Sequence, residues 1–317
     1  MKRRVVLLGV FAAMVCADQN EALAQGADIL SNSSVQRPTG VRRFSGWDNN
    51  SMNGATARPL PKADLPAVRA AAKNLGLAQQ PLSSRNAVSV AADSGQKRFA
   101  GNINSTPLKW AGRLFYREPD GNYRCSAQFV ASRVVLTAAH CVRDADTGQW
   151  YSDHVFALQY RDGRYSRRFD WQCKSTKQGW VQKGDGKWLW DFAFILVDAN
   201  SPTGFFGTTW NWEGSYDTAV KIGYPKGISD GERIQVDKGP ISVSDGIVEL
   251  KHGNEADQAG SSGGAWIGKY TTTFTPQSNY VLSHESFSYD GTPGVDYGPY
   301  YTEHFNDLFN YTARGCK

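Results

Sequence analysis

The heptapeptide VLTAAHC, residues 135–141, decides the fold, because it places His140 directly after a short run of apolar and β-branched residues. Apolar runs of this length, bounded by turn-forming residues, favour buried strands over helices. We therefore expect His140 at the end of a buried strand. Cys125 stands sixteen residues before Cys141, in position to bridge to it across a hairpin.

A second segment, GSSGGA at residues 260–265, places Ser262 among glycines. Glycine allows the backbone to turn tightly and to bring two N–H groups toward one oxygen atom with no side chain in the way. Taken singly, His140 could be a structural histidine and Ser262 a turn residue. The two segments in this order favour instead a histidine and a serine that act together.

An acidic residue lies between these two segments, in WDFAFI at residues 190–195. Asp191 opens an apolar strand, and an isolated carboxylate would be costly to bury there, so we expect it to have a partner. Asp198 is the rival acid, but it follows the apolar strand rather than opening it. We therefore prefer Asp191.

Together, the three segments resemble the His, Asp and Ser boxes of the trypsin-like serine proteases, over roughly residues 100–317. IGYP at residues 222–225, with the short interval from Asp191 to Ser262, is similar to the bacterial glutamyl-endopeptidase-like (V8-like) branch more than to animal trypsins. The resemblance implies an all-β fold of two six-stranded antiparallel β-barrels with a C-terminal helix. It also implies an active site between the barrels.

The activity that this resemblance implies is that of a serine endopeptidase acting on protein or peptide substrates through an acyl-enzyme intermediate. Ser262 Oγ would attack the scissile carbonyl, His140 would carry the proton to the leaving amine, and Asp191 would orient the imidazole. The backbone N–H groups of Gly260 and Ser262 would bind the developing oxyanion. Neither a metal nor an organic cofactor is implied.

The sequence departs from the family pattern in one feature of activation, and it leaves the substrate specificity open. Most animal trypsin-like enzymes have an acid before the nucleophile, which pairs with the new N-terminal amine, but Ser261 stands there in this chain. Candidate pocket residues are Ala256 and Asp257, before the serine, and His284, after it. His284 resembles the histidine that helps hold the substrate carboxylate in glutamyl endopeptidases, and an ordinary packed histidine is the alternative. Asp257 would favour Lys or Arg.

The residue pattern from Leu108 onward also favours an all-β fold, because short apolar runs alternate there with the turn-forming residues Gly, Asp, Asn and Pro. A closing helix is expected over residues 306–313. The chain has ten tryptophans, six of them between residues 171 and 212. We expect them to fill barrel cores and to pack the loops between the barrels, with a sugar-binding platform or a substrate-binding rim as the alternative.

Residues 25–98 form a leader of different composition, rich in Ser, Asn, Ala, Gly and Pro, with one helix-like stretch at residues 65–77. We expect this leader to bury little apolar surface, and we interpret it as a pro-segment or disordered leader preceding a protease domain at residues 99–317. A cut after the dibasic pair Lys97-Arg98 would release Phe99 as a new N-terminus and activate a zymogen. A linker that is never removed is the alternative.

Residues 1–24 are expected to be a cleaved secretory signal, because three basic residues precede an apolar run and Ala22-Leu23-Ala24 supplies small residues for a signal peptidase. The apolar run is too short to span a bilayer, which disfavours a membrane anchor. Export, to the periplasm or the medium, would leave four cysteines and favour two disulfides. The sequence alone leaves three pairings of these cysteines open. Of these we predict Cys125–Cys141, with Cys173–Cys316 as the second disulfide.

Charge is unevenly distributed between the leader and the domain. Residues 25–98 hold 10 basic and 4 acidic residues, a net charge of +6. Residues 99–317 hold 22 basic and 24 acidic residues, a net charge of −2. The near-neutral domain argues against a nucleic-acid partner, and the leader itself is the expected partner. We expect the protein to be a monomer. The rival function is a non-catalytic homologue that acts as a surface or carbohydrate-binding protein.

Overall fold

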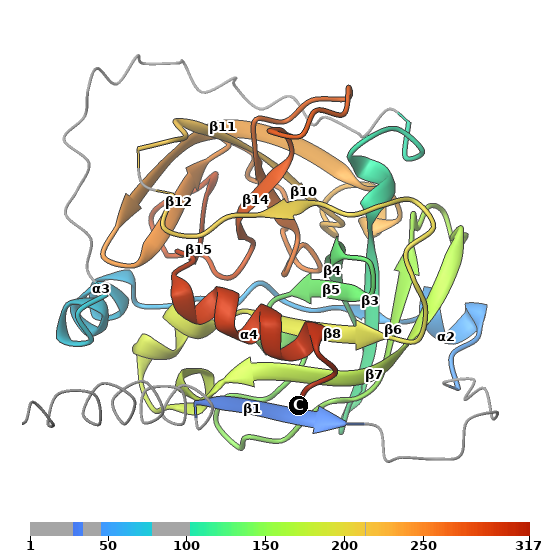
Figure 1. The fold of residues 1–317 in the computed structure, drawn as a ribbon, viewed down its shortest axis with the longest axis horizontal. Coiled ribbons are helices and arrows are strands. Elements are labelled where there is room, and N and C mark those ends of the chain that lie inside the picture. Colours follow the sequence, from blue (N-terminus) through green and yellow to red (C-terminus); the bar gives the residue numbers. More distant parts are fainter. Residues whose placement is uncertain (1–27, 34–45, 78–101, 213) are drawn as a thin grey trace, which may run out of the picture.

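The computed structural model describes residues 28–33, 46–77, 102–212 and 214–317, and the predicted signal and Lys97-Arg98 lie outside these ranges. Two β-barrels make up most of the described chain, the first below and the second above in Figure 1. Within the described ranges, no helix is long and apolar enough to cross a membrane.

The first barrel consists of six antiparallel strands in the order β7-β6-β3-β4-β5-β8, and β7 also pairs with β8, which closes it. Their bounds are β3 (Ala111–Glu118), β4 (Gly121–Ala131), β5 (Val134–Thr137), β6 (Ser152–Leu158), β7 (Arg167–Lys177) and β8 (Ala193–Val197). Two short strands of the leader extend this sheet. β1 (Ile29–Ser33) pairs antiparallel with β7, and β2 (Thr56–Ala57) pairs in parallel with β4.

The second barrel follows the order β15-β12-β11-β10-β13-β14, again antiparallel, and a bridge between Phe287 and Tyr297 brings its two edges together. Its strands are β10 (Thr218–Gly223), β11 (Gln235–Ser244), β12 (Ile247–Lys251), β13 (Ala265–Gly268), β14 (Tyr280–His284) and β15 (Val295–Pro299). The short β9 (Gly207–Thr208) pairs in parallel with β14. The chain then closes with helix α4 (Glu303–Ala313), so the predicted double barrel and C-terminal helix are confirmed.

Short 3₁₀ turns connect the strands and position several site residues. Those in the described chain are η1 (Leu108–Trp110), η2 (Ala139–Cys141), η3 (Gln178–Val181), η4 (Asp185–Trp190) and η5 (Ser229–Gly231). η2 begins two residues after β5, and η4 ends one residue before Asp191. The turns that follow and precede the paired strands β5 and β8 therefore carry His140 and introduce Asp191.

Both predicted disulfides are present. Cys125–Cys141 joins β4 to η2, and Cys173–Cys316 joins β7 to the end of the chain after α4. A disulfide stabilises mainly by restricting the unfolded chain, and the second bond closes the longer loop, with 143 residues of separation against 16. It therefore ties the C-terminal helix to the first barrel, against which α4 lies in Figure 1.

Aromatic side chains fill the barrel interiors and pack the connecting turns, where Trp180 lies in η3 and Trp188 in η4. In the first barrel, Phe129 meets Phe156 and Phe169 edge to face at ring-centroid distances of 5.2 and 5.0 Å, a favourable geometry for aromatic pairs. The tryptophans that are buried are Trp47, Trp110, Trp180, Trp188, Trp212 and Trp266. Only Trp210 is more than a third exposed, so the described surface presents no cluster of exposed tryptophans.

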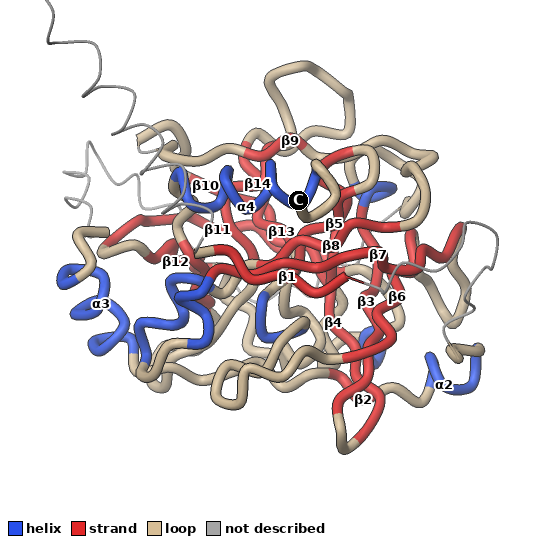
Figure 2. Tube along the Cα trace, turned by 60° about the horizontal axis from the view of Figure 1, so that its bottom comes forward, coloured by secondary structure: helices blue, strands red, loops and turns tan. Residues whose placement is uncertain are grey.

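The leader packs against the barrels over residues 46–77, which corrects the expectation that it buries little apolar surface. Helix α3 (Leu65–Asn74) begins at the N-cap Asp64 and buries Leu65, Val68 and Ala72, which share one helical face. Trp47 is also buried, near the short helix α2 (Asn49–Asn53). The apolar residues are few but face the domain, and average composition does not reveal this. Figure 2 shows α2 and α3 at opposite ends of the molecule.

Candidate active site

His140 and Asp191 form a buried, hydrogen-bonded pair. Pairing of β5 with β8 brings the end of one strand to the start of the other, with Thr137 opposite Ala193. The Nδ1–H of His140 donates to Asp191 Oδ2 at 2.8 Å, and the backbone N–H of His140 donates to Asp191 Oδ1 at 2.8 Å. Asp191 is fully buried and His140 is 3% exposed. The Asp191 carboxylate therefore has a partner, as its position in the sequence predicted.

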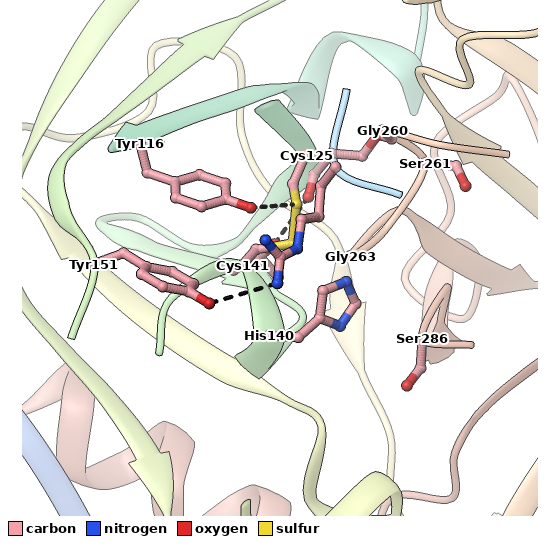
Figure 3. The surroundings of a disulfide bond; sticks show 12 residues. Tyr116, Cys125, His140, Cys141, Tyr151, Gly260, Ser261, Gly263 and Ser286 are labelled. Carbon is pink, nitrogen blue, oxygen red and sulfur yellow. Dashed lines mark hydrogen bonds between the residues drawn. A yellow bond between two sulfur atoms is a disulfide. The ribbon is translucent and has the colours of Figure 1, made fainter. Parts of the chain in front are cut away.

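Asp191 receives further support from the second barrel. Ser286 Oγ donates to Asp191 Oδ2 at 2.5 Å. The rival Asp198 lies elsewhere: its carboxylate accepts a hydrogen bond from the backbone N–H of Asp170, and its side chain is on the surface. Only Asp191, of these two acids, contacts His140. Figure 3 shows the His140 ring beside the Cys125–Cys141 disulfide, with Ser286 on its other side.

Ser262 lies in a tightly packed loop next to the same strand end. Its carbonyl oxygen accepts a hydrogen bond from Ser126 N at 2.8 Å. The following residue, Gly263, has φ of +80°, and a Cβ there would lie 2.8 Å from Ala138 N and closer still to Thr137 Oγ1. Only glycine fits this position without strain or overlap. The glycine-rich sequence thus lets the Ser262 loop approach the segment that carries His140.

The two atoms that would exchange a proton are not joined by a hydrogen bond in this structure. Within the described chain, Ser262 Oγ and His140 Nε2 are both buried and form no hydrogen bond. Buried polar atoms usually have partners, so these two mark a site whose chemistry is not used for structure. The N–H of Gly260, one of the two predicted oxyanion donors, instead donates to the carbonyl oxygen of Arg58 in the leader at 2.7 Å.

His284 is placed behind Asp191 rather than open to solvent. Its Nε2–H donates to the carbonyl oxygen of Asp191 and its Nδ1 accepts from Tyr301 OH, both at 2.7 Å. Burial lowers the pKa of His284 to about 4, so the ring is neutral at neutral pH. Both ring nitrogens are engaged within the protein, which fits the alternative of a packed histidine.

The other two pocket candidates lie in the loop before Ser262. Asp257 is exposed, and its carboxylate accepts from the backbone N–H of Ala259 at 2.9 Å, so it faces its own loop. Ala256 is half-buried, and its carbonyl accepts from Gln258 Nε2 at 2.8 Å. In the described structure, Asp257 forms no hydrogen bond or ion pair with His140 or Ser262.

A buried charged cluster beneath this loop was not anticipated from the sequence. Lys221 Nζ pairs with Glu285 at 2.8 Å and also with Asp296, which in turn contacts His252 at 2.6 Å. Burial, and secondarily Asp296, raise the pKa of Glu285. Burial opposes ionisation of Asp296, but Lys221 and His252 outweigh it and lower its pKa. Lys221 and Asp296 come from β10 and β15, and His252 and Glu285 directly follow β12 and β14, so no sequence pattern joins them.

Lys221 connects the cluster to the loop that carries Ser262. Its Nζ donates to Gln258 Oε1 at 2.9 Å, and the Gln258 carbonyl accepts from Ser261 N at 3.0 Å and from Ser261 Oγ at 2.6 Å. Hydrogen bonds to a charged group such as the Lys221 ammonium restrain the groups that they join, although Glu285 Oε1 in the same cluster is buried without a hydrogen bond. The hydrogen bond from Lys221 to Gln258 therefore helps to hold the loop that carries Ser262 in place.

Comparisons with known proteins agree with this architecture. No protein-family model matches the sequence, and no curated protein matches it. Among solved structures, protease Anisep from Arthrobacter nicotinovorans is similar with a TM-score of 0.56 and 22% identity, over 66% of this chain and 98% of that one. Serine protease AL20 from an extremophilic microorganism is similar with a TM-score of 0.55 and 23% identity, over 65% of this chain and 98% of that one. A Glu endopeptidase is similar with a TM-score of 0.58 and 18% identity, over 70% of this chain and 98% of that one. The chain thus has the double-barrel fold of bacterial trypsin-like serine proteases, including a Glu endopeptidase.

Proposed function

We propose that this protein is a serine endopeptidase in which Ser262 is the nucleophile, His140 the general base and acid, and Asp191 the residue that orients His140. The observation that carries the proposal is the buried His140–Asp191 pair, whose outward nitrogen has no hydrogen bond, together with a buried Ser262 hydroxyl that also has none, in a loop packed against Ala138. The fold shared with proteases adds to it.

The reaction follows from these positions. Ser262 Oγ attacks the carbonyl carbon while His140 Nε2 takes its proton, and the carbonyl electrons move to the oxygen, which the N–H groups of Gly260 and Ser262 stabilise. Collapse of this intermediate breaks the C–N bond, and the amine leaves with the proton from His140. Water then attacks the acyl-serine ester with His140 again as base, releasing the acid and restoring Ser262.

Export and disulfide formation belong to the same proposal. Two disulfides fit an oxidising compartment, which supports a secreted or periplasmic protease with protein or peptide substrates. The leader is proposed to be a pro-segment and the chain a zymogen. A monomer without a nucleic-acid partner or stable membrane insertion completes the proposal.

The test is mass spectrometry of a peptide library digested by the full chain and by its Ser262→Ala variant. Each is assayed before and after treatment with an immobilised activating protease that is then removed. We expect cleavage that disappears with Ser262→Ala, and the cut sites will report whether Glu, Lys or Arg is preferred. Equal digestion by both chains, or none by either, would refute the proposal; the second result would favour a binding protein.

Kinetics provide a second check on the triad. Ser262→Ala and His140→Ala should each lower kcat by ~10⁴ or more, and the double variant should be little worse than either one. Losses that add would show that the two residues do not act as a unit. Circular dichroism of each variant controls for folding.

A further inference from the structure

Residues 56–63 of the leader, which we call the strap, cross the molecule between the two barrels. Figure 1 shows the light-blue chain passing from α2 to α3 through the region where the barrels meet. At the first barrel, β2 pairs in parallel with β4 at Tyr123 and Arg124, and Arg58 N donates to the Arg124 carbonyl at 3.0 Å. The strap thus adds backbone hydrogen bonds to the edge of the first barrel.

At the second barrel, the strap pairs in the same way with the segment that supports Asp191. Ser288 lies two residues after Ser286, whose hydroxyl holds the Asp191 carboxylate. Ser288 N donates to the Pro61 carbonyl at 2.9 Å, and Ala63 N donates to the Ser288 carbonyl at 3.1 Å. Backbone pairing of an extended segment with exposed strand edges is how many proteins hold peptides.

Between these two contacts, the strap covers an element of the proposed catalytic machinery. The Gly260 N–H, proposed to bind the oxyanion, donates to the Arg58 carbonyl at 2.7 Å. Ala57 lies against the same residue, because a Cβ on Gly260 would be 3.3 Å from Ala57 Cβ. With that donor engaged and Ser262 fully buried, a substrate carbonyl cannot take this position while the strap is in place.

Two apolar anchors hold the strap at its ends. Before it, Trp47 packs on Phe115 at a ring-centroid distance of 5.6 Å and donates its Nε1–H to the Asp153 carbonyl at 2.7 Å. After it, α3 packs against η4, the turn that precedes Asp191. Val68 of α3 is completely buried, and burial of apolar surface stabilises the docked helix.

Charge complementarity adds to this apolar contact. In one ion pair a domain cation meets a leader carboxylate, Lys177–Asp28 at 3.8 Å. In the other ion pairs described between leader and domain, a leader cation meets a domain carboxylate. Within the described chain these are Arg58–Glu118, Lys62–Asp290, Arg69–Glu249 and Lys73–Asp245. Arg58 is the least exposed of these cations, and its guanidinium also lies over the Tyr123 ring at 5.5 Å from the centroid. It is therefore the ion pair that matters most for docking.

The strap is bound in a way that does not favour its own cleavage. The Arg58 side chain is held by Glu118 and by Tyr151 OH on the first barrel. The bond that follows the Arg58 carbonyl ends at the nitrogen of Pro59, where a ring carbon replaces the amide hydrogen. Pro59 and Pro61 also restrict the unbound strap, which lowers the entropy lost on docking.

We propose that the strap is an intramolecular inhibitor, which covers Gly260 and the surface between β4 and Ser288 until it is displaced. The inference rests on the proposed function, because a latent enzyme requires a competent active site. It assigns residues 56–63 to inhibition, with residues 46–55 and α3 as anchors.

The experiment compares the rates at which a fluorophosphonate probe, which reacts with activated serines, labels the full chain and its Arg58→Glu variant. This substitution places a second carboxylate beside Glu118, so we expect labelling at least ~10 times faster than in the original chain. Hydrogen exchange measured by mass spectrometry should show lost protection over residues 56–63. Val68→Asp, which weakens α3 docking, is a second variant with the same expected result. Thermal melting followed by circular dichroism verifies that both fold.

Two controls make the outcome decisive. Arg314→Glu makes the same charge reversal at an exposed position and should leave labelling unchanged. Ser262→Ala combined with Arg58→Glu should abolish labelling. Equal labelling of the original chain and both folded strap variants, lost with Ser262→Ala, would overturn the strap as inhibitor while leaving the protease intact. No labelling of any folded chain would overturn the proposed function and the inhibitor with it.

Discussion

Gly263→Ala is predicted to destabilise the domain far more than the same change at Gly291, although both glycines have positive φ. Gly263 has φ of +80° and Gly291 has φ of +86°. An L-residue in this conformation costs about 1–2 kcal/mol. At Gly291 nothing lies within 4 Å of the added Cβ, so that strain is the whole cost. At Gly263 the Cβ overlaps Thr137 Oγ1, Ser126 O and Ala138 N.

The overlap at Gly263 is not easily relieved, because Thr137 Oγ1 is itself hydrogen-bonded to the Ser126 carbonyl at 2.9 Å. Overpacking of this kind adds about 1–3 kcal/mol. For a domain of this size each kcal/mol lowers Tm by about 2–4 °C, so Gly263→Ala should melt about 2–12 °C below Gly291→Ala. Differential scanning calorimetry of the two variants measures this gap. Equal melting temperatures would refute the reasoning that the Ser262 loop is fixed by close packing against β5.

Two further predictions concern buried polar groups. Burial lowers the pKa of Lys174 from 10.5 to about 7, so the unfolded chain binds more protons between these values and stability should rise with pH from about 7 to 10, by up to about 1.4 kcal/mol per pH unit. Lys174→Met should flatten this slope in urea unfolding at pH 7 and 9, and an unchanged slope would contradict the assignment. Ser286→Ala removes a hydrogen bond to the Asp191 carboxylate and should lower kcat/KM by up to ~10-fold. Ser286→Thr, which keeps the hydroxyl, is the matched variant, and equal losses in both would argue that packing rather than the hydrogen bond is at work.

The sequence was sufficient to predict the elements that carry the candidate site, because their signals are local. An apolar run followed by His140 indicated β5 and its end, and Asp191 opening an apolar run indicated the start of β8. Both barrels and the closing helix followed from the resemblance. The pairing of β5 with β8, which brings the two residues together, is a property of the barrel and is visible only in the fold.

What could not be predicted depends on contacts between distant segments. Ser286 reaches Asp191 across 95 residues of chain, and His284 reaches it across 93. Which face of β14 and of the segment after it points to Asp191 depends on strand register, and a shift of one residue would reverse the choice. The role of Arg58 was hidden for another reason: the leader resembles a disordered segment in composition, and a few well-placed apolar residues dock it.

Three of the contacts between leader and domain follow one another along the chain: β1 on β7, β2 on β4, and α3 against η4. A cut at Lys97-Arg98 would leave all three on one peptide, so each contact would hold the others at a high effective concentration. We therefore expect such a cut to produce two chains that remain together, separable in denaturant but co-eluting under native conditions. Release would require further cuts between the contacts, because only then does each become a short interaction that dissociates by itself.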